Sequence, residues 1–385
     1  MQNLDKHYLA IDASNIRHGG GITHLSQLIK HTEKDNINFD KVFLWAGQAT
    51  LDQIPERDWL VKKSHFLLNG NLLLRTFWQK FWLKKALSKN FCSVLFVLGG
   101  SIYTSFKPVI NFHQNLLPFE LSEIRRYGFS IKKIKFSLLR VIQSYSMKKS
   151  NAIIYLSHLS KAVVENTIKK KIKNKVIHHG IESRFFQSPK QQKTMDSYTA
   201  QKPFKIIYIS SIDNYKHQWH VVEAAASLRE EGYPIQLDLY GAANTSPLKR
   251  LNSAIEKFDK DSSYIYYSDE VNFLEVHSIY QTSDLSVFAS SCETFGQIVL
   301  ESMASGLPIA CSNMSSMKEI IKDGCVYFNP LDPKDIKKAI KSLLDSPRYR
   351  EEVSTRAYDY AKNFSWQETS RQTFKFLKEI QEELS

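Results

Sequence analysis

Two glutamates eight residues apart, Glu293 and Glu301, flank a short turn made of Thr294, Phe295 and Gly296. The turn follows an apolar run and precedes QIVLESMASG, which has helical spacing. A glycine turn before a helix presents backbone N–H groups and the positive end of the helix dipole, which suits an anionic diphosphate. Glu293 could then reach a sugar hydroxyl, and Glu301 could accept hydrogen bonds from a ribose diol. From the spacing alone, two solvated glutamates with no role in binding are an equally good interpretation.

A lysine follows a second apolar run of the same half. Lys216 stands in the loop of IIYISSIDNYKHQWHVVEAAASL (206–228), after small residues that include Ser211. A lysine side chain is a mobile point charge suited to phosphate. We therefore predict that Lys216 and Ser211 belong to the same anion site, with an ordinary surface lysine as the alternative.

The first half holds two comparable positions. Gly20 and Gly21 lie in a run of three glycines between a predicted strand and a predicted helix that starts near Ile22, where the backbone could approach a ligand closely. His113 follows the apolar run PVINFH directly. From the residues alone, a plain turn and a structural histidine are the better interpretations of both.

Strands alternating with helices must position these residues. The predicted strands are at 7–12, 41–47, 93–100, 108–113, 151–157 and 174–180 in the first half, and at 204–211, 235–241, 262–268, 284–290 and 307–312 in the second. The alternation predicts an α/β protein with two Rossmann-like parallel sheets. Ligands of such sheets bind at the carboxyl ends of the strands, so two domains facing each other would form a cleft.

The domain boundaries follow from length and composition. The chain has 385 residues, 43% of them hydrophobic, which is enough for two cores. Residues 186–203 are polar with two prolines and are the predicted linker. We expect an N-terminal domain at 1–188, a C-terminal domain at 204–364, and a final helix at 365–385.

The motif around the glutamates resembles a known signature. E-T-F-G-x-x-x-x-E-x-M-A-x-G-x-P, with Asp284 upstream, is similar to that of glycosyltransferase family 4, retaining enzymes of GT-B fold. The resemblance covers nearly the whole C-terminal half. It implies an N-terminal acceptor-binding domain at 1–188, a C-terminal nucleotide-sugar donor-binding domain at 204–364, and a final helix at 365–385 that crosses back to the N-terminal domain. It also implies a sugar donor bound at Glu293, at the turn after it and at Glu301.

The resemblance also implies roles for the other candidates. Lys216 matches a lysine that contacts the donor diphosphate, the glycine loop at Gly20 and Gly21 would border that phosphate, and His113 would orient or polarise the donor sugar. The sequence departs from the pattern at Ser211 and His217, where the family often has arginine and glycine. Retention is usually explained by front-face attack, in which the departing phosphate takes the acceptor's proton, so no protein nucleophile is expected.

The first half resembles enzymes that extend lipid-linked bacterial surface glycans, through IDASNIRHGGGITHL and NFHQNLLPFELSEIRRYGFS. We therefore expect a hexosyltransferase of lipopolysaccharide (O-antigen) or capsule assembly, with a lipid-linked glycan acceptor. The donor could be GDP-mannose or a UDP-hexose.

Charge is distributed unevenly along the chain. Residues 1–200 hold 31 Lys/Arg and 13 Asp/Glu, whereas residues 201–385 hold 21 and 26. Two stretches, 76–87 and 125–140, mix apolar and basic residues at helical spacing, as interfacial helices do. We expect the N-terminal domain to contact an anionic membrane surface, although a core-facing helix with a solvated basic side explains each stretch equally well.

Several features limit the site and the compartment. The four cysteines show no C-x-x-C spacing, and no apolar run approaches 18 residues. The sequence after Met1 lacks a secretion signal. We predict a cytoplasmic enzyme, peripheral on the inner face of the cytoplasmic membrane. No D-x-D pair follows a predicted strand, so no metal and no cofactor is expected.

Two other classes of protein remain as alternatives. One is another GT-B enzyme, a phosphorylase or a nucleotide-sugar hydrolase, although no motif for a pyridoxal phosphate lysine is present. The other is a basic nucleic-acid-binding protein, suggested by a pI of about 9.3. That class gives no reason for an E-x7-E loop and helix, so no nucleic-acid partner is expected.

Overall fold

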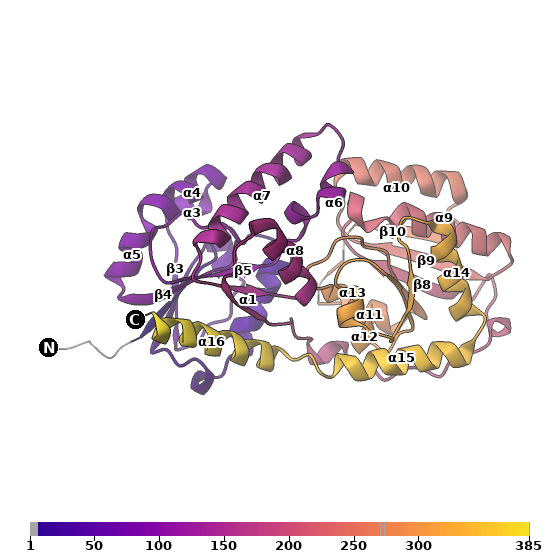
Figure 1. Ribbon diagram of the computed structural model, residues 1–385. Coiled ribbons are helices and arrows are strands. Elements are labelled where there is room, and N and C mark those ends of the chain that lie inside the picture. The colour runs from indigo at the N-terminus through magenta and orange to yellow at the C-terminus, as the bar shows by residue number, and fades with distance from the viewer. Residues whose placement is uncertain (1–6, 270, 273, 385) are drawn as a thin grey trace. The chain divides into compact units, whose positions relative to one another are not determined.

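The computed structural model describes residues 7–269, 271–272 and 274–384, and the chain forms two compact units (Figure 1). The first unit comprises residues up to 120, 129–180 and those from 365 onward, and the second comprises 121–128 and 181–364. The chain therefore enters the second unit at 181, before the expected boundary at 188. Residues 121–128 also belong to the second unit, which no sequence pattern predicted.

The first unit contains a seven-stranded sheet of order β3-β2-β1-β4-β5-β6-β7. All its neighbouring strands pair in parallel, and most are buried on both faces, as continuous apolar runs require. The strands are β1 (Tyr8–Asp12), β2 (Lys41–Trp45), β3 (Leu60–Lys63), β4 (Cys92–Val97), β5 (Val109–His113), β6 (Ala152–Tyr155) and β7 (Lys173–Val176). Six were predicted, and the edge strand β3, in which two apolar residues are followed directly by two lysines, was missed.

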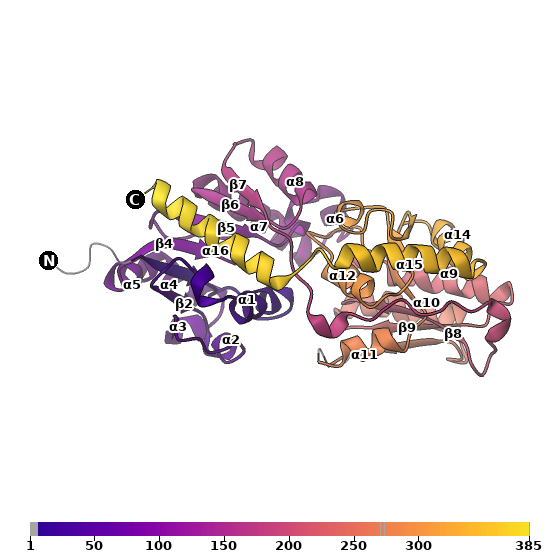
Figure 2. The same ribbon diagram turned by 90° about the horizontal axis from the view of Figure 1, so that it is seen from below.

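Helices cover both faces of this sheet. They are α1 (Gly20–Lys30), α2 (Gln48–Leu51), α3 (Phe66–Asn69), α4 (Leu72–Phe81), α5 (Leu83–Lys89), α7 (Ile131–Lys149), α8 (His158–Ile168) and α16 (Trp366–Glu383). Figures 1 and 2 show α4 and α7 on one side of the sheet and α16 on the other. Trp78, Leu83 and Leu87 pack into one core cluster with sheet residues such as Leu95.

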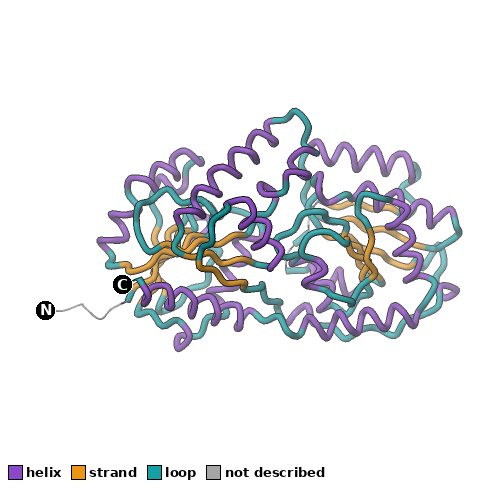
Figure 3. Tube along the Cα trace, in the orientation of Figure 1, coloured by secondary structure: helices purple, strands orange, loops and turns teal. Residues whose placement is uncertain are grey.

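The second unit contains a six-stranded parallel sheet of order β10-β9-β8-β11-β12-β13. Figure 3 shows the strands of each unit inside a layer of helices. The strands are β8 (Phe204–Ile209), β9 (Ile235–Tyr240), β10 (Ile265–Ser268), β11 (Leu285–Phe288), β12 (Ile309–Ser312) and β13 (Val326–Phe328). Its helices are α6 (Leu121–Arg125), α9 (Gln218–Glu230), α10 (Thr245–Phe258), α11 (Val276–Gln281), α12 (Gln297–Ala304), α13 (Met317–Ile320), α14 (Pro333–Leu344) and α15 (Pro347–Ala361).

The last helix returns to the first unit, as expected. Ser365 caps α16 by accepting from the backbone N–H of Glu368 at 3.0 Å, which ends the preceding loop at a defined residue. The hydroxyl of Thr369 donates to the carbonyl of His178 at 2.8 Å. These bonds attach the C-terminal segment next to β7, far from it in sequence.

The predicted linker is ordered against the second unit. Arg350, fully buried, donates from Nε to Oε1 of Gln192 at 2.9 Å and also bonds the carbonyl of Lys193. Lys190 donates to the carbonyl of Ser283 at 2.8 Å. Gly306, just past α12, has φ +63, and an added Cβ would lie 2.5 Å from the carbonyl oxygen of Gln187. The polar segment is therefore part of the second unit.

Candidate functional site

The structure brings two predicted residues of the second unit together. Lys216 and Glu293 form an ion pair. They meet because β8 and β11 are neighbours in the sheet, so the loops after their carboxyl ends converge. The Lys216 ammonium also lies 5.1 Å from the ring centroid of Tyr215 and 5.2 Å from that of Phe288. An ammonium held among aromatic rings is desolvated, which strengthens its attraction for a negative charge.

The loop that carries Glu293 is held by two serine hydroxyls from the segment after β12. The backbone N–H of Glu293 donates to Oγ of Ser315 at 2.6 Å. The hydroxyl of Ser316 donates to the carbonyl of Phe295 at 2.9 Å. The carboxylate is thus presented by a fixed backbone. Sequence reasoning missed Ser315 and Ser316, since nothing local links them to a residue 22 positions earlier.

The turn and the helix after it have the expected geometry. Gly296 adopts φ +99, a left-handed conformation that favours glycine, and α12 begins at the next residue. Phe295 is buried with its ring 5.8 Å from that of Phe364, and Thr294 is largely buried. The positive end of α12 therefore lies directly beside the Glu293 loop.

Glu301 occupies a separate, buried environment. Its Oε2 accepts from the hydroxyl of Tyr280 at 3.3 Å, and burial raises the pKa of its carboxyl to about 8. Arg184 opposes this shift and Glu182 adds to it. Sequence reasoning missed Tyr280 and Arg184, which are far from α12 in sequence.

The two positions that depart from the family pattern also differ from each other in the structure. Ser211 is exposed, and its carbonyl accepts from Nε2 of Gln218 at 3.0 Å. His217 is buried at φ +52, and its Nε2 lies 2.9 Å from Oγ of Ser291. Burial lowers the pKa of His217 to about 3, so the ring is neutral at pH 7. The left-handed backbone at 217 explains why glycine is common there.

A segment that sequence reasoning did not assign to this site also packs beside it. The hydroxyl of Tyr127, just after α6, donates to Oδ1 of Asp213 at 2.9 Å. Nδ2 of Asn244 donates to the other carboxylate oxygen of Asp213 at 3.0 Å. Asp213 in turn caps the short turn that ends at Lys216. Tyr127 and Asn244 therefore help to fix the loop that presents the lysine.

The remaining predicted residues lie in the first unit. His113 ends β5, is buried, and burial lowers its pKa to about 3. Its Nε2 has no hydrogen-bond partner among the described residues. The helix α1 begins at Gly20, two residues before the expected start. A Cβ added to Gly21 would lie 3.4 Å from Nε2 of Gln114, so the glycine run adjoins the end of β5.

The described residues also bear on metal binding and on membrane insertion. No cluster of three or more His, Cys, Asp or Glu side chains has a spacing that could hold a metal ion. Within the same described part of the chain, every helix is too short or too polar to cross a bilayer.

Comparison with known protein families matches residues 190–360 to the family described as glycosyl transferases group 1. D-inositol 3-phosphate glycosyltransferase of Paenarthrobacter aurescens is 26% identical over 207 residues, 52% of this chain and 50% of that protein. O-antigen chain mannosyltransferase B of Escherichia coli is 28% identical over 175 residues, 45% of each chain. The alignments thus span about half the length of these curated relatives.

Solved structures match over almost the whole chain. Sucrose-phosphate synthase from Thermosynechococcus elongatus has a TM-score of 0.77 at 14% identity, covering 97% of this chain and 99% of that one. HepE from Anabaena, solved in complex with UDP and glucose, has a TM-score of 0.70 at 15% identity, with coverages of 97% and 100%. At these identities the likeness shows the fold, which is GT-B.

Proposed function

We propose that this chain transfers a hexosyl group from a nucleotide-diphosphate sugar, because residues 190–360 match the family described as glycosyl transferases group 1. The observation that carries the proposal is the Lys216–Glu293 pair beside the N-terminal end of α12. Cleavage of a glycosyl–phosphate bond develops negative charge on the diphosphate and positive charge at the anomeric carbon. A desolvated cation, a helix dipole and a carboxylate within one site match both charges.

In this proposal the ion pair opens when the donor binds. The diphosphate takes the Lys216 ammonium as its counter-ion, assisted by the backbone of Thr294, Phe295 and Gly296. Glu293 is then available to accept hydrogen bonds from the sugar hydroxyls, on a loop fixed by Ser315. Such fixed charges stabilise the transition state without reorganising during the reaction. We propose that no metal is required and that Ser211 contributes backbone contacts.

We propose that the reaction retains anomeric configuration, with the departing phosphate oxygen accepting the proton of the acceptor hydroxyl. This proposal rests on the family resemblance of the signature around Glu293. His113, neutral because its pKa is about 3, would accept or donate one hydrogen bond to the donor sugar but would carry no positive charge. The glycine run at Gly20 and Gly21 would let the backbone approach the phosphate.

For the acceptor we propose a lipid-linked glycan of bacterial surface polysaccharide assembly, which locates the enzyme at the inner face of the cytoplasmic membrane. The relative from Escherichia coli described as an O-antigen chain mannosyltransferase supports this acceptor class and makes mannose the first sugar to test.

The test is ligand-induced stabilisation, followed by transfer. UDP, GDP, ADP and their hexoses are added without metal to the wild type, to Lys216→Ala and to the control Lys334→Ala, an exposed lysine at the start of α14. A ligand at 100 times its Kd adds about 2.7 kcal/mol of stability. We expect one nucleotide to stabilise the wild type and the control but to act weakly on Lys216→Ala. Equal stabilisation of all three proteins would remove Lys216 from the site, and no stabilisation by any nucleotide would contradict the proposal.

A further inference from the structure

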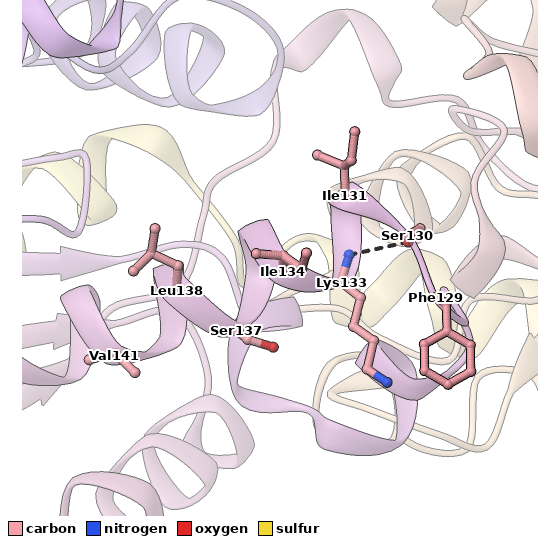
Figure 4. Close-up of a pocket in the computed structure, with 8 residues that line it drawn as sticks. All are labelled: Phe129, Ser130, Ile131, Lys133, Ile134, Ser137, Leu138 and Val141. Atoms are coloured by element: carbon pink, nitrogen blue, oxygen red, sulfur yellow. Dashed lines mark hydrogen bonds between the residues drawn. The ribbon is translucent and has the colours of Figure 1, made fainter.

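One face of α7 is apolar and exposed. Ile131, Ile134, Leu138, Val141 and Tyr145 recur three and four residues apart, which places them on one side of the helix. Each of these side chains is between 57% and 85% exposed. Figure 4 shows Ile131, Ile134 and Leu138 projecting to the same side of α7. A contiguous apolar stripe in water is typical of a binding surface.

This face is open and is not a small-molecule cavity. The hollow over it has a volume of about 810 Å³, but it is lined only by α7 and the two residues before it, Phe129 and Ser130. Phe129 is fully exposed, and the Lys133 ammonium lies 5.3 Å from its ring centroid. Among the described residues no element other than α7 and the two residues before it lines the hollow, so an extended partner fits it better than a compact ligand.

A second exposed apolar surface lies on the same side of the sheet as α7, at α4 (Figures 1 and 2). Its large side chains, between 42% and 78% exposed, are Leu72, Leu73, Leu74, Phe77, Phe81 and Trp82. Two separate apolar surfaces on one side of one unit indicate a broad partner.

The charge of the sequence around both helices favours a negatively charged partner. Residues 59–120 and 129–164, all in the first unit, hold 15 Lys/Arg and one acidic residue, Glu120. The helix α7 by itself contains six basic residues and no acidic one: Lys132, Lys133, Lys135, Arg140, Lys148 and Lys149. Two copies of such a surface would repel each other, because neither offers a carboxylate to the other. An apolar stripe flanked only by cations is complementary to anionic headgroups over acyl chains.

We propose that α4 and α7 together form a docking surface for an anionic lipid bilayer. The apolar side chains enter the boundary between headgroups and acyl chains, while the lysines lie against the lipid phosphates. Docking would present the enzyme to a lipid-linked acceptor, and only this purpose rests on the proposed function. Binding to vesicles can be measured without any transfer reaction.

The experiment is sedimentation of the full chain with vesicles of phosphatidylcholine, alone or mixed with phosphatidylglycerol, across a salt series. Two variants test the surface: Ile134→Ser/Leu138→Ser, and Lys132→Gln/Lys133→Gln/Lys135→Gln. Matched controls are Leu384→Ser, an exposed leucine after α16 on the other side of the sheet, and Lys334→Gln in the second unit. All these positions except Lys132 and Lys133 are exposed, and those two are half-buried.

We expect binding to the mixed vesicles only, weakened by salt. The triple lysine variant should bind on the order of 100-fold more weakly, and the apolar variant at least about tenfold more weakly. Both controls should bind like the wild type. Wild-type affinity in both variants, or equal binding to neutral vesicles, would overturn the proposal. The proposal would also be overturned if the wild type bound no vesicles and light scattering showed a dimer that Ile134→Ser/Leu138→Ser converts to a monomer. The apolar face would then belong to an interface with a second copy of the chain.

Vesicle binding and transfer fail independently. A surface variant that no longer binds vesicles but still transfers a hexose to a detergent-solubilised acceptor would be defective in docking alone. Vesicle binding by the wild type without transfer of any hexose would refute the proposed function and leave the docking surface in place.

Discussion

The hydroxyl of Tyr280 donates to Oε2 of Glu301 at 3.3 Å in the interior of the second unit. Burial raises the pKa of this carboxyl to about 8, so it is mostly protonated at pH 7 in the unliganded protein. Hydrogen bonds donated by a ribose diol favour the ionised form. If Glu301 binds the ribose diol, as its place in the motif predicts, nucleotide binding would therefore be coupled to the loss of its proton.

The first prediction concerns that proton. We expect nucleotide binding at pH 7 to release up to one proton, and affinity to increase as pH rises towards 8, because the binding-competent carboxylate becomes more populated. Calorimetry in two buffers of different ionisation enthalpy measures the release. Glu301→Gln is the control and should release none; the same release from the variant would remove Glu301 from the nucleotide site.

The second prediction concerns the Lys216–Glu293 pair. Lys216→Ala should lower kcat by about 10²–10³, the usual cost of removing one group that stabilises developing negative charge. It also leaves a partly buried carboxylate without its cation, which costs about 1–3 kcal/mol of unfolding free energy. Lys216→Met/Glu293→Gln should regain part of that stability while transfer stays low. A double variant no more stable than Lys216→Ala would argue against the pairing.

The third prediction separates packing from function at two glycines. A Cβ at Gly20 meets nothing within 4 Å, whereas a Cβ at Gly180 would lie 2.1 Å from the backbone nitrogen of Trp366. Gly180→Ala should therefore cost more than about 3 kcal/mol in urea unfolding. Gly20→Ala should leave stability within about 0.5 kcal/mol of the wild type but raise KM, because the methyl occupies the space that a ligand needs. An unchanged KM in Gly20→Ala would show that Gly20 has no role in substrate binding.

The fourth prediction concerns acid stability of the first unit. Nδ1 of His24 lies 3.0 Å from Nδ1 of His179, and burial lowers the pKa of His24 to about 3. This pKa in the folded protein is below the value of His24 in the unfolded chain. The neutral, buried His24 therefore contributes fully to the free energy of unfolding above pH 6.5, and this contribution is lost as pH falls. Between pH 6.5 and 5 the wild type should lose about 2 kcal/mol through this residue.

Replacement of His24 tests that assignment. His24→Phe keeps the stacking on Phe112, whose ring centroid lies 4.4 Å away, but breaks the bond to His179. The variant should be less stable than the wild type at pH 7.5, and the difference should narrow by pH 5 in urea titrations. A difference that stays constant with pH would mean that His24 is not the titrating group.

The fold was predictable where local pattern and long-range packing coincide. Eleven of the thirteen strands in the described part of the chain follow from apolar runs bounded by glycine or polar residues. The two that were missed are β13, which has only three residues, and β3, where the apolar run stops after Val61 at two lysines. The C-terminal helix was expected, and Ser365 with Glu368 three residues later explains its start.

The site was predictable only in part. Glu293, Gly296 and Lys216 stand next to strand ends, where sequence carries the signal. Ser315, Tyr280 and Tyr127 act through contacts with residues 21–86 positions away, and no local pattern encodes such contacts. Ser211 was expected to share the site with Lys216 and stays a prediction; in the structure it is exposed, and its carbonyl accepts a hydrogen bond from Gln218.

The buried guanidinium of Arg350 binds the polar segment before β8, and this contact limits where a fragment of the second unit could begin. A fragment that began at residue 204 would remove Gln192 and the Lys193 carbonyl, and would leave that charge inside a core with two fewer acceptors. A fragment of the second unit should therefore begin before Gln192, and it would still lack residues 121–128, which belong to the same unit. The proline-containing segment before β8 is hydrogen-bonded to Arg350 of α15, so a protease would find it ordered. Mild digestion should therefore leave the chain in one piece.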